Sequence, residues 1–79
     1  MDVPLIEVER KAWDYILYER EEQLILSVVV GSVALYEVNV ALNAQETAAY
    51  RSHGIQALLP LVEEIRGQSN RLHPRHIRL

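Results

Sequence analysis

Hydrophobic residues dominate the stretch 23–43, which reads QLILSVVVGSVALYEVNVALN. Apart from one Glu it carries no charge, it is rich in Val, Leu and Ile, and it is interrupted once, at Gly31-Ser32. Gly at the first position of a two-residue loop supplies the positive φ of a type II′ turn. The pattern therefore predicts a hairpin of two strands, at residues 23–30 and 33–42.

A third strand is indicated before this hairpin. Residues 12–20 (AWDYILYER) contain one Trp, two Tyr and one Ile, a composition typical of strands. Glu21-Glu22 then forms a polar two-residue turn, which places Tyr18 opposite Ile25. Apolar residues between 5 and 20 also fit one helical face, so a helix there remains the alternative. We expect the chain before this strand to be irregular or partly helical.

Both faces of the expected sheet are apolar, because side chains alternate along a strand and paired residues share a face. The first face holds Ile16, Tyr18, Ile25, Ser27, Val29, Ala34, Tyr36, Val38, Val40 and Leu42. The second face holds Trp13, Tyr15, Leu17, Leu24, Leu26, Val28, Val30, Val33 and Leu35, followed by Glu37 and Asn39. A sheet with one helix on it would ordinarily be apolar on one face only.

One long helix is predicted at residues 44–66. Asn43 and Glu46 form a capping-box pattern at its start, and apolar residues then recur at spacings of three, four and seven. Gly54 weakens a helix by about 1 kcal/mol relative to Ala. Pro60 should kink the helix or split it, because proline lacks the backbone N–H that the helix ladder needs.

These elements predict one α+β domain over residues 1–67. A three-stranded antiparallel β-meander packs on one long C-terminal helix, which lies across the first face. A basic, flexible C-terminal tail is expected at residues 68–79, because a helix-ending Gly precedes it and a Pro interrupts it.

The short chain and the second apolar face together predict self-association. A domain of 79 residues buries little core, and the chain has no Cys for a disulfide. We expect a homodimer through the second face, with cover by residues 1–11 as the rival arrangement. The expected interface consists of Trp13, Tyr15, Leu17, Leu24, Leu26, Val28, Val30, Val33 and Leu35.

No pattern of residues in the chain points to catalysis, a cofactor or a metal. It contains no nucleophile motif and no Gly-rich phosphate loop, and Pro74 separates the only closely spaced pair of histidines, His73 and His76. The basic end carries Arg71, Arg75 and Arg78, a weak contact for anions. Nucleic acid is not an expected partner, because the remainder of the chain is acidic. Without a secretory signal or an apolar span we expect a cytoplasmic protein and no membrane contact.

The sequence therefore favours a small non-enzymatic interaction or modulator protein that acts as a homodimer. The alternative is a small-molecule-binding domain built on the Trp/Tyr cluster, since aromatic side chains commonly line ligand pockets. That cluster consists of Trp13, Tyr15, Tyr18 and Tyr36.

Overall fold

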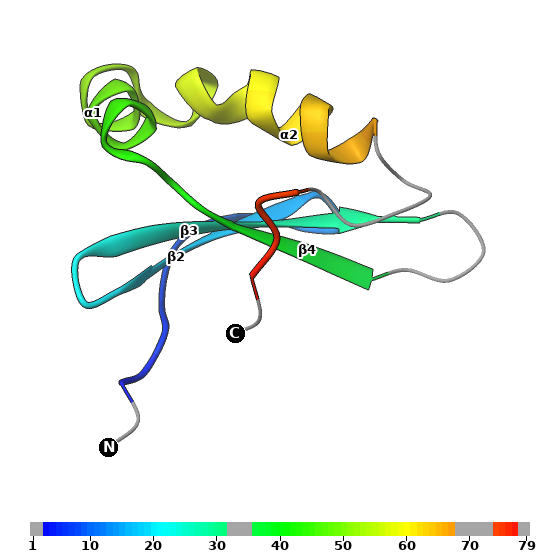
Figure 1. Cartoon of the computed structure of the whole chain (residues 1–79), viewed down its shortest axis with the longest axis horizontal. Helices are drawn as coiled ribbons and strands as arrows, with labels where there is room; N and C mark the ends of the chain where they lie inside the picture. The colour runs from blue at the N-terminus through cyan, green and yellow to red at the C-terminus, as the bar shows by residue number, and fades with distance from the viewer. Residues whose placement is uncertain (1–2, 32–35, 68–73, 78–79) are drawn as a thin grey trace.

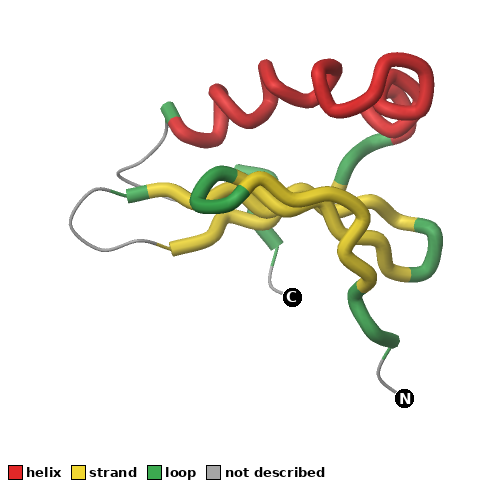
Figure 2. The backbone as a smooth tube through the Cα atoms, turned by 180° about the vertical axis from the view of Figure 1, so that it is seen from behind, coloured by secondary structure: helices red, strands yellow, loops and turns green. Residues whose placement is uncertain are grey.

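A four-stranded antiparallel sheet carries a helical layer on one side in the computed structural model of the chain (Figure 1). The structure describes residues 3–31, 36–67 and 74–77. The described residues that lead into β1 lie on the side of the sheet away from the helices (Figures 1 and 2). The strands are β1 (Ile6–Lys11), β2 (Tyr15–Arg20), β3 (Gln23–Val30) and β4 (Tyr36–Ala41), in the spatial order β1-β2-β3-β4. The helices are α1 (Ala44–His53), the 3₁₀-helix η1 (Gly54–Leu58) and α2 (Leu59–Arg66).

The prediction of an α+β fold is confirmed, and the prediction of three strands is wrong because β1 is a fourth. Its alternation of Ile6 and Val8 with two glutamates is a strand pattern, although five of its six residues are exposed. β1 pairs antiparallel with β2, and a turn at residues 12–14 joins them. The segment expected to be irregular or partly helical is therefore an edge strand, and β2 begins at Tyr15 rather than at residue 12.

The β2–β3 hairpin has the predicted two-residue turn. Arg20 lies opposite Gln23, and Tyr18 lies opposite Ile25. Glu21 and Glu22 both adopt positive φ, 51° and 67°, as a type I′ turn requires. Their polarity identified the turn in the sequence, even though Asn and Gly fit this backbone better.

The β3–β4 hairpin differs from the prediction in its register. Val30 pairs with Tyr36 and Val28 with Val38, so five residues connect the strands instead of two. The shift is three residues, and an odd shift moves every side chain of β4 to the other face of the sheet. Val38 and Val40 therefore join Leu26 and Val28 on one face.

This register gives the sheet one strongly apolar face, and the helices cover it. On that face the core holds Tyr15, Leu17, Leu24, Leu26, Val28, Val30, Val38, Val40 and Leu42, packed against Leu58, Leu61, Val62 and Ile65 of the helical layer. The helices were expected on the face of Ile25 and Ser27, so that assignment is wrong. The helix-free face carries Ile16, Tyr18, Ile25, Ser27, Val29, Glu37 and Asn39.

The helical layer is split into two α-helices. The capping box is present: Glu46 N–H donates to Asn43 Oδ1 over 2.8 Å, and Asn43 N–H donates to Glu46 Oε1 over 2.9 Å. Gly54 ends α1 with φ 77°, and Pro60 lies in the first turn of α2, where no backbone N–H is needed. Among the described residues, no helix is long and apolar enough to cross a membrane.

Residues 74–77 of the expected tail lie against β4. The backbone N–H of Asn39 donates to His76 Nδ1 over 3.0 Å, and the Ile77 N–H donates to the Asn39 carbonyl over 2.7 Å. The Asn39 side-chain amide also donates to the Ile77 carbonyl over 3.2 Å. His76 and Ile77 are thus held by β4. The residues of the expected flexible tail other than 74–77 lie outside the described part of the chain.

Leu26→Ala should lower the free energy of unfolding by about 2–5 kcal/mol, because Leu26 is fully buried beneath the helices. Leu59→Ala removes the same atoms from a side chain that is 42% exposed and should cost less than about 1 kcal/mol. Urea denaturation of both variants measures the difference. Equal losses would contradict the packing of the helices on this face.

Candidate interaction surface

Most of the interface residues expected from the sequence lie in the core of the single chain. Tyr15, Leu17, Leu24, Leu26, Val28 and Val30 are all buried beneath the helices. Val33 and Leu35 lie outside the described residues. The ninth, Trp13, is 83% exposed. A second chain could reach the six buried side chains only if the helices moved away, so a contact surface must be sought elsewhere.

The exposed apolar side chains gather at the N-terminal edge of the sheet. Among the described residues, the large hydrophobic side chains that remain exposed are Val3, Ile6, Val8, Trp13 and Leu59. The first four lie within eleven consecutive residues, on β1 or next to one of its ends. We call Val3, Ile6, Val8 and Trp13 the edge patch. These four exposed side chains follow one another along the free edge of the sheet, with Val3 before β1 and Trp13 beyond its other end.

Trp13 occupies an unfavourable backbone position in the β1–β2 turn. The turn is closed by the Asp14 N–H, which donates to the Lys11 carbonyl over 3.0 Å, and Trp13 has a φ of 64°. The left-handed region costs an ordinary residue about 1–2 kcal/mol and favours Gly or Asn. Since the indole is largely exposed, its burial within the chain does not offset this cost. Folding alone therefore does not explain a Trp at this position.

A shallow recess of about 260 Å³ lies beside the Trp13 side chain. Val29, Tyr36 and Glu37 complete its lining, so it is formed where the β1–β2 turn meets the ends of β3 and β4. The Val29 N–H donates to the Asp14 carbonyl over 2.9 Å and ties the turn to β3. The turn that carries Trp13 is therefore held in place by a hydrogen bond to β3.

Arg66 at the end of α2 anchors the same turn from the helical layer. Its guanidinium pairs with Asp14 Oδ1, and Lys11 Nζ lies 3.4 Å from Asp14 Oδ2. Burial acts to raise the pKa of Asp14, but the hydrogen bond and charge of Arg66, assisted by Lys11, outweigh it and lower the pKa below its ordinary value. The charged form of Asp14 is therefore the form that holds the turn.

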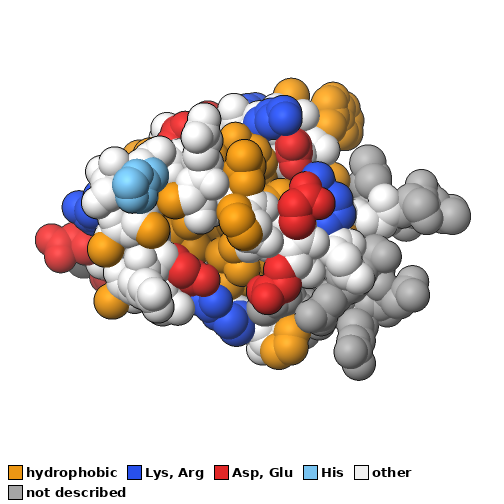
Figure 3. Space-filling view, turned by 90° about the horizontal axis from the view of Figure 1, so that it is seen from above, with side chains coloured by type: hydrophobic (Ala, Val, Ile, Leu, Met, Phe, Trp, Pro, Cys, Tyr) orange, Lys and Arg blue, Asp and Glu red, His pale blue; other side chains and the backbone are white. Residues whose placement is uncertain are grey.

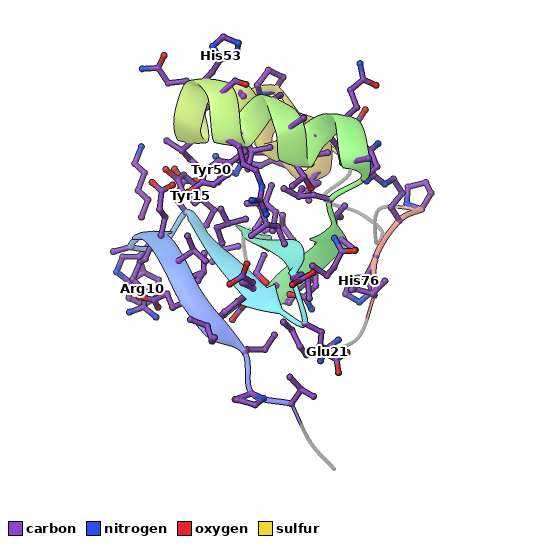
Figure 4. The ribbon with its side chains drawn as sticks, turned by 90° about the vertical axis from the view of Figure 1, so that its left-hand side faces the viewer. Arg10, Tyr15, Glu21, Tyr50, His53 and His76 are labelled. Carbon is purple, nitrogen blue, oxygen red and sulfur yellow. The ribbon has the colours of Figure 1, made fainter. Side chains whose placement is uncertain are left out.

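Tyr50 joins α1 to β1. Its hydroxyl donates to Glu9 Oε2, and its ring points toward the sheet near Tyr15 (Figure 4). Burial, followed by the hydrogen bond and charge of Glu9, raises the pKa of Tyr50 to about 12. The edge strand is thus fixed to the helical layer from its inner side, while Arg10 lies at the outer part of the sheet (Figure 4).

The tyrosines of the predicted aromatic cluster are dispersed. Tyr15 is 7% exposed in the core, and Tyr18 lies on the helix-free face. Of the three, Tyr36 alone lines the recess beside Trp13. The sequence grouped these residues by composition, and the register separates them.

Arg75 is engaged within the chain. Its two terminal nitrogens donate to Glu46 over 2.9 and 2.7 Å, and one also donates to the Ala41 carbonyl over 2.9 Å. The hydrogen bond to Glu46 raises the pKa of Arg75. The two other arginines of the expected anion contact, Arg71 and Arg78, lie outside the described residues.

A second recess, of about 250 Å³, opens on the helical side of the molecule. Figure 3 shows this side, where apolar side chains gather between acidic and basic ones. The recess is lined by Glu46, Ala57, Leu58, Pro60, Leu61 and Glu64. Because Glu46 already serves both the capping box and Arg75, its carboxylate has a structural role in this recess.

No three His, Asp or Glu side chains in the described part of the chain are grouped so that they could hold a metal ion. Of the histidines, His53 points away from the sheet on α1, and His76 lies beside β4 (Figure 4). Comparison of the chain with protein-family models, curated proteins and solved structures finds no match.

Acidification should weaken the ion pairs of Asp14 with Arg66 and Lys11, which hold the Trp13 turn. The lowered pKa of Asp14 means that its contribution to stability is fully present above about pH 4 and is lost as the pH falls through the folded-state value. Wild-type protein should therefore exceed Asp14→Asn in free energy of unfolding at about pH 6, and the difference should shrink below about pH 4.

Denaturant titrations at several pH values measure that difference. Glu21→Gln, at an exposed turn position, serves as the control and should show little of this pH dependence. A difference between wild type and Asp14→Asn that stays constant down to about pH 2 would contradict the proposed role of the charged carboxylate.

Proposed function

We propose that this protein is a non-enzymatic interaction protein that self-associates through the edge patch. The observation that carries the proposal is Trp13, held exposed on a backbone position that favours Gly or Asn. An unfavourable conformation that persists in a folded protein is grounds for a functional hypothesis. Tryptophan is also among the residues that contribute most to protein–protein contacts.

A second copy of the chain is the occupant that the surface supports best. The edge patch places three aliphatic side chains and one indole along a single segment, and burial of each large apolar side chain is worth about 1.5–3 kcal/mol. Because the domain is small, such burial would add substantially to its stability. The dimer expected from the sequence is therefore retained, with its contact moved from the helix-covered face to the β1 edge.

Binding of a small molecule beside Trp13 has weaker support. The recess of about 260 Å³ lies below the range of about 300–1,000 Å³ typical of ligand pockets. Only Tyr36 of the predicted tyrosines lines it. A recess of this size suits one side chain of a protein partner better than a cofactor.

Trp13→Asn should weaken self-association by at least about tenfold without destabilising the monomer. Asn adopts the left-handed conformation readily, so the free energy of unfolding should stay unchanged or rise by about 1 kcal/mol. Sedimentation equilibrium across the micromolar range gives the association constant, and denaturation of dilute samples gives the stability of the monomer. Leu59→Ala, which alters an exposed apolar side chain on α2, should leave association unchanged.

The emission of Trp13 provides a second readout, since the chain contains one Trp. Dimerisation should bury the indole, so the emission should shift to shorter wavelength as the protein concentration rises. A 9.1 kDa species throughout the micromolar range, with unchanged emission, would refute self-association. A shift produced only by an added metabolite would support the small-molecule alternative instead.

A further inference from the structure

β1 is an edge strand with an uneven distribution of charge. It lies at one end of the strand order, whereas the other end, β4, is bridged at Val40 by His76. In its sequence, IEVERK, Glu7 and Glu9 precede Arg10 and Lys11. Charged side chains and a bulge on an edge strand generally prevent pairing with unrelated strands. A second copy of β1 is an exception, because in antiparallel orientation it presents the same charges and the same bulge in the reverse order along the strand.

The charge order of β1 is complementary to itself in antiparallel orientation. When the pairing is centred between Val8 and Glu9, Glu7 of each copy faces Arg10 of the other, and Ile6 faces Lys11. Opposite charges directly across from each other stabilise a pair of strands, and like charges destabilise it. Centring the pairing on Val8 itself would instead place Glu7 opposite Glu9 of the second copy. The charges therefore favour the first of these two registers over the second.

The bulge in β1 makes this register geometrically consistent. Residues 7 and 10 of a regular strand point to opposite faces. In β1 the pairing with β2 shifts between Glu7 and Glu9, so that Val8 is the extra residue. Glu7 pairs with Tyr18 and Arg10 with Ile16, and these two residues of β2 share a face.

The intrachain ion pair gives independent support for this common face. Arg10 Nε lies 3.1 Å from Glu7 Oε1 within the same chain. The two side chains are 57% and 47% exposed, so their mutual attraction is weak and either can turn to a second copy at little cost. A regular strand paired with β1 would lose its register at Val8, because it has no extra residue there. A second copy of β1 has the same extra residue, and in this pairing the Val8 of each copy lies opposite Glu9 of the other.

We propose that two copies of the protein pair β1 with β1 in antiparallel orientation about a two-fold axis, with Glu7 of each copy facing Arg10 of the other. This inference rests on the self-association proposed above and specifies its geometry. The two four-stranded sheets join into one sheet of eight strands, and the exposed edge of each copy is paired.

The same arrangement accounts for the remaining members of the edge patch. In this register the Trp13 turn of one copy, two residues beyond Lys11, lies beside Val3 and Pro4 of the second copy. Ile6 lies opposite the aliphatic part of Lys11, which can cover it while the ammonium stays in water.

Charge reversal tests the register directly. Glu7→Arg alone places two guanidinium groups opposite each other at each contact with Arg10 of an identical copy, and Arg10→Glu alone places two carboxylates opposite each other. Each variant should dimerise at least about tenfold more weakly than wild type, because the two-fold axis repeats the repulsion twice. An equimolar mixture of the two variants should form a heterodimer in which each of the two contacts joins a base to an acid, so mixing should restore association to near wild-type affinity.

The double variant Glu7→Arg/Arg10→Glu provides the rescue, because both contacts between its copies again join opposite charges. It should dimerise with near wild-type affinity, whereas Glu7→Arg with Glu21→Arg, which adds a reversal at the exposed β2–β3 turn, should stay as weak as Glu7→Arg alone. Circular dichroism of each variant verifies the fold.

The double variant also restores the ion pair within each chain, so the stability of dilute monomer is measured beside the association constant. The register predicts that the association constant falls in the single variants and recovers in the double variant. These changes should be far larger, as free energies, than any change in the stability of the monomer. If wild type dimerises and the single reversals dimerise equally well, the proposed register is refuted while self-association stands. If wild type is itself monomeric, the proposed function fails, and the register fails with it.

Discussion

The pairing of Val28 with Val38 is the constraint on which the rest of this structure depends. It sets β4 so that Val38 and Val40 lie beside Leu26 and Val28, and it leaves Ser27 opposite Asn39 on the other face. One apolar face then receives both helices. The polar Ser27 and Asn39 meet through a side-chain hydrogen bond of 2.5 Å, and Asn39 in turn holds the C-terminal segment. A single register thus explains which face is covered by helices and where residues 74–77 bind.

Local signals in the sequence were sufficient for some elements and not for others. The β2–β3 turn and the capping box at Asn43 each depend on adjacent residues, and both were predicted with the observed register or partners. The β3–β4 register depends on how all apolar side chains sort between two faces. Gly31 has the predicted positive φ, yet the two-residue loop it suggested is not formed, because the observed register buries Val38 and Val40 beneath the helices.

Part of the candidate surface could also be predicted from the sequence. Trp13 was among the expected contact residues, but most of the others lie in the core, because exposure depends on which face the helices cover. The alternation in IEVERK was a visible strand signal that competed with a helical interpretation of the same segment. The strain at Trp13 and the bulge at Val8 are backbone features, and neither residue type indicates them. The two features that suggest a contact surface therefore become apparent only in three dimensions.

Nuclear Overhauser effects between β3 and β4 test the central register most directly. The observed register predicts contacts between the methyl groups of Val28 and Val38 and between those of Leu26 and Val40, together with contacts from both valines of β4 to Leu58 or Val62 in the helical layer. The two-residue loop would instead place Leu35 opposite Val28 and Glu37 opposite Leu26. Observation of that second pattern would return Val38 and Val40 to the helix-free face and contradict the account.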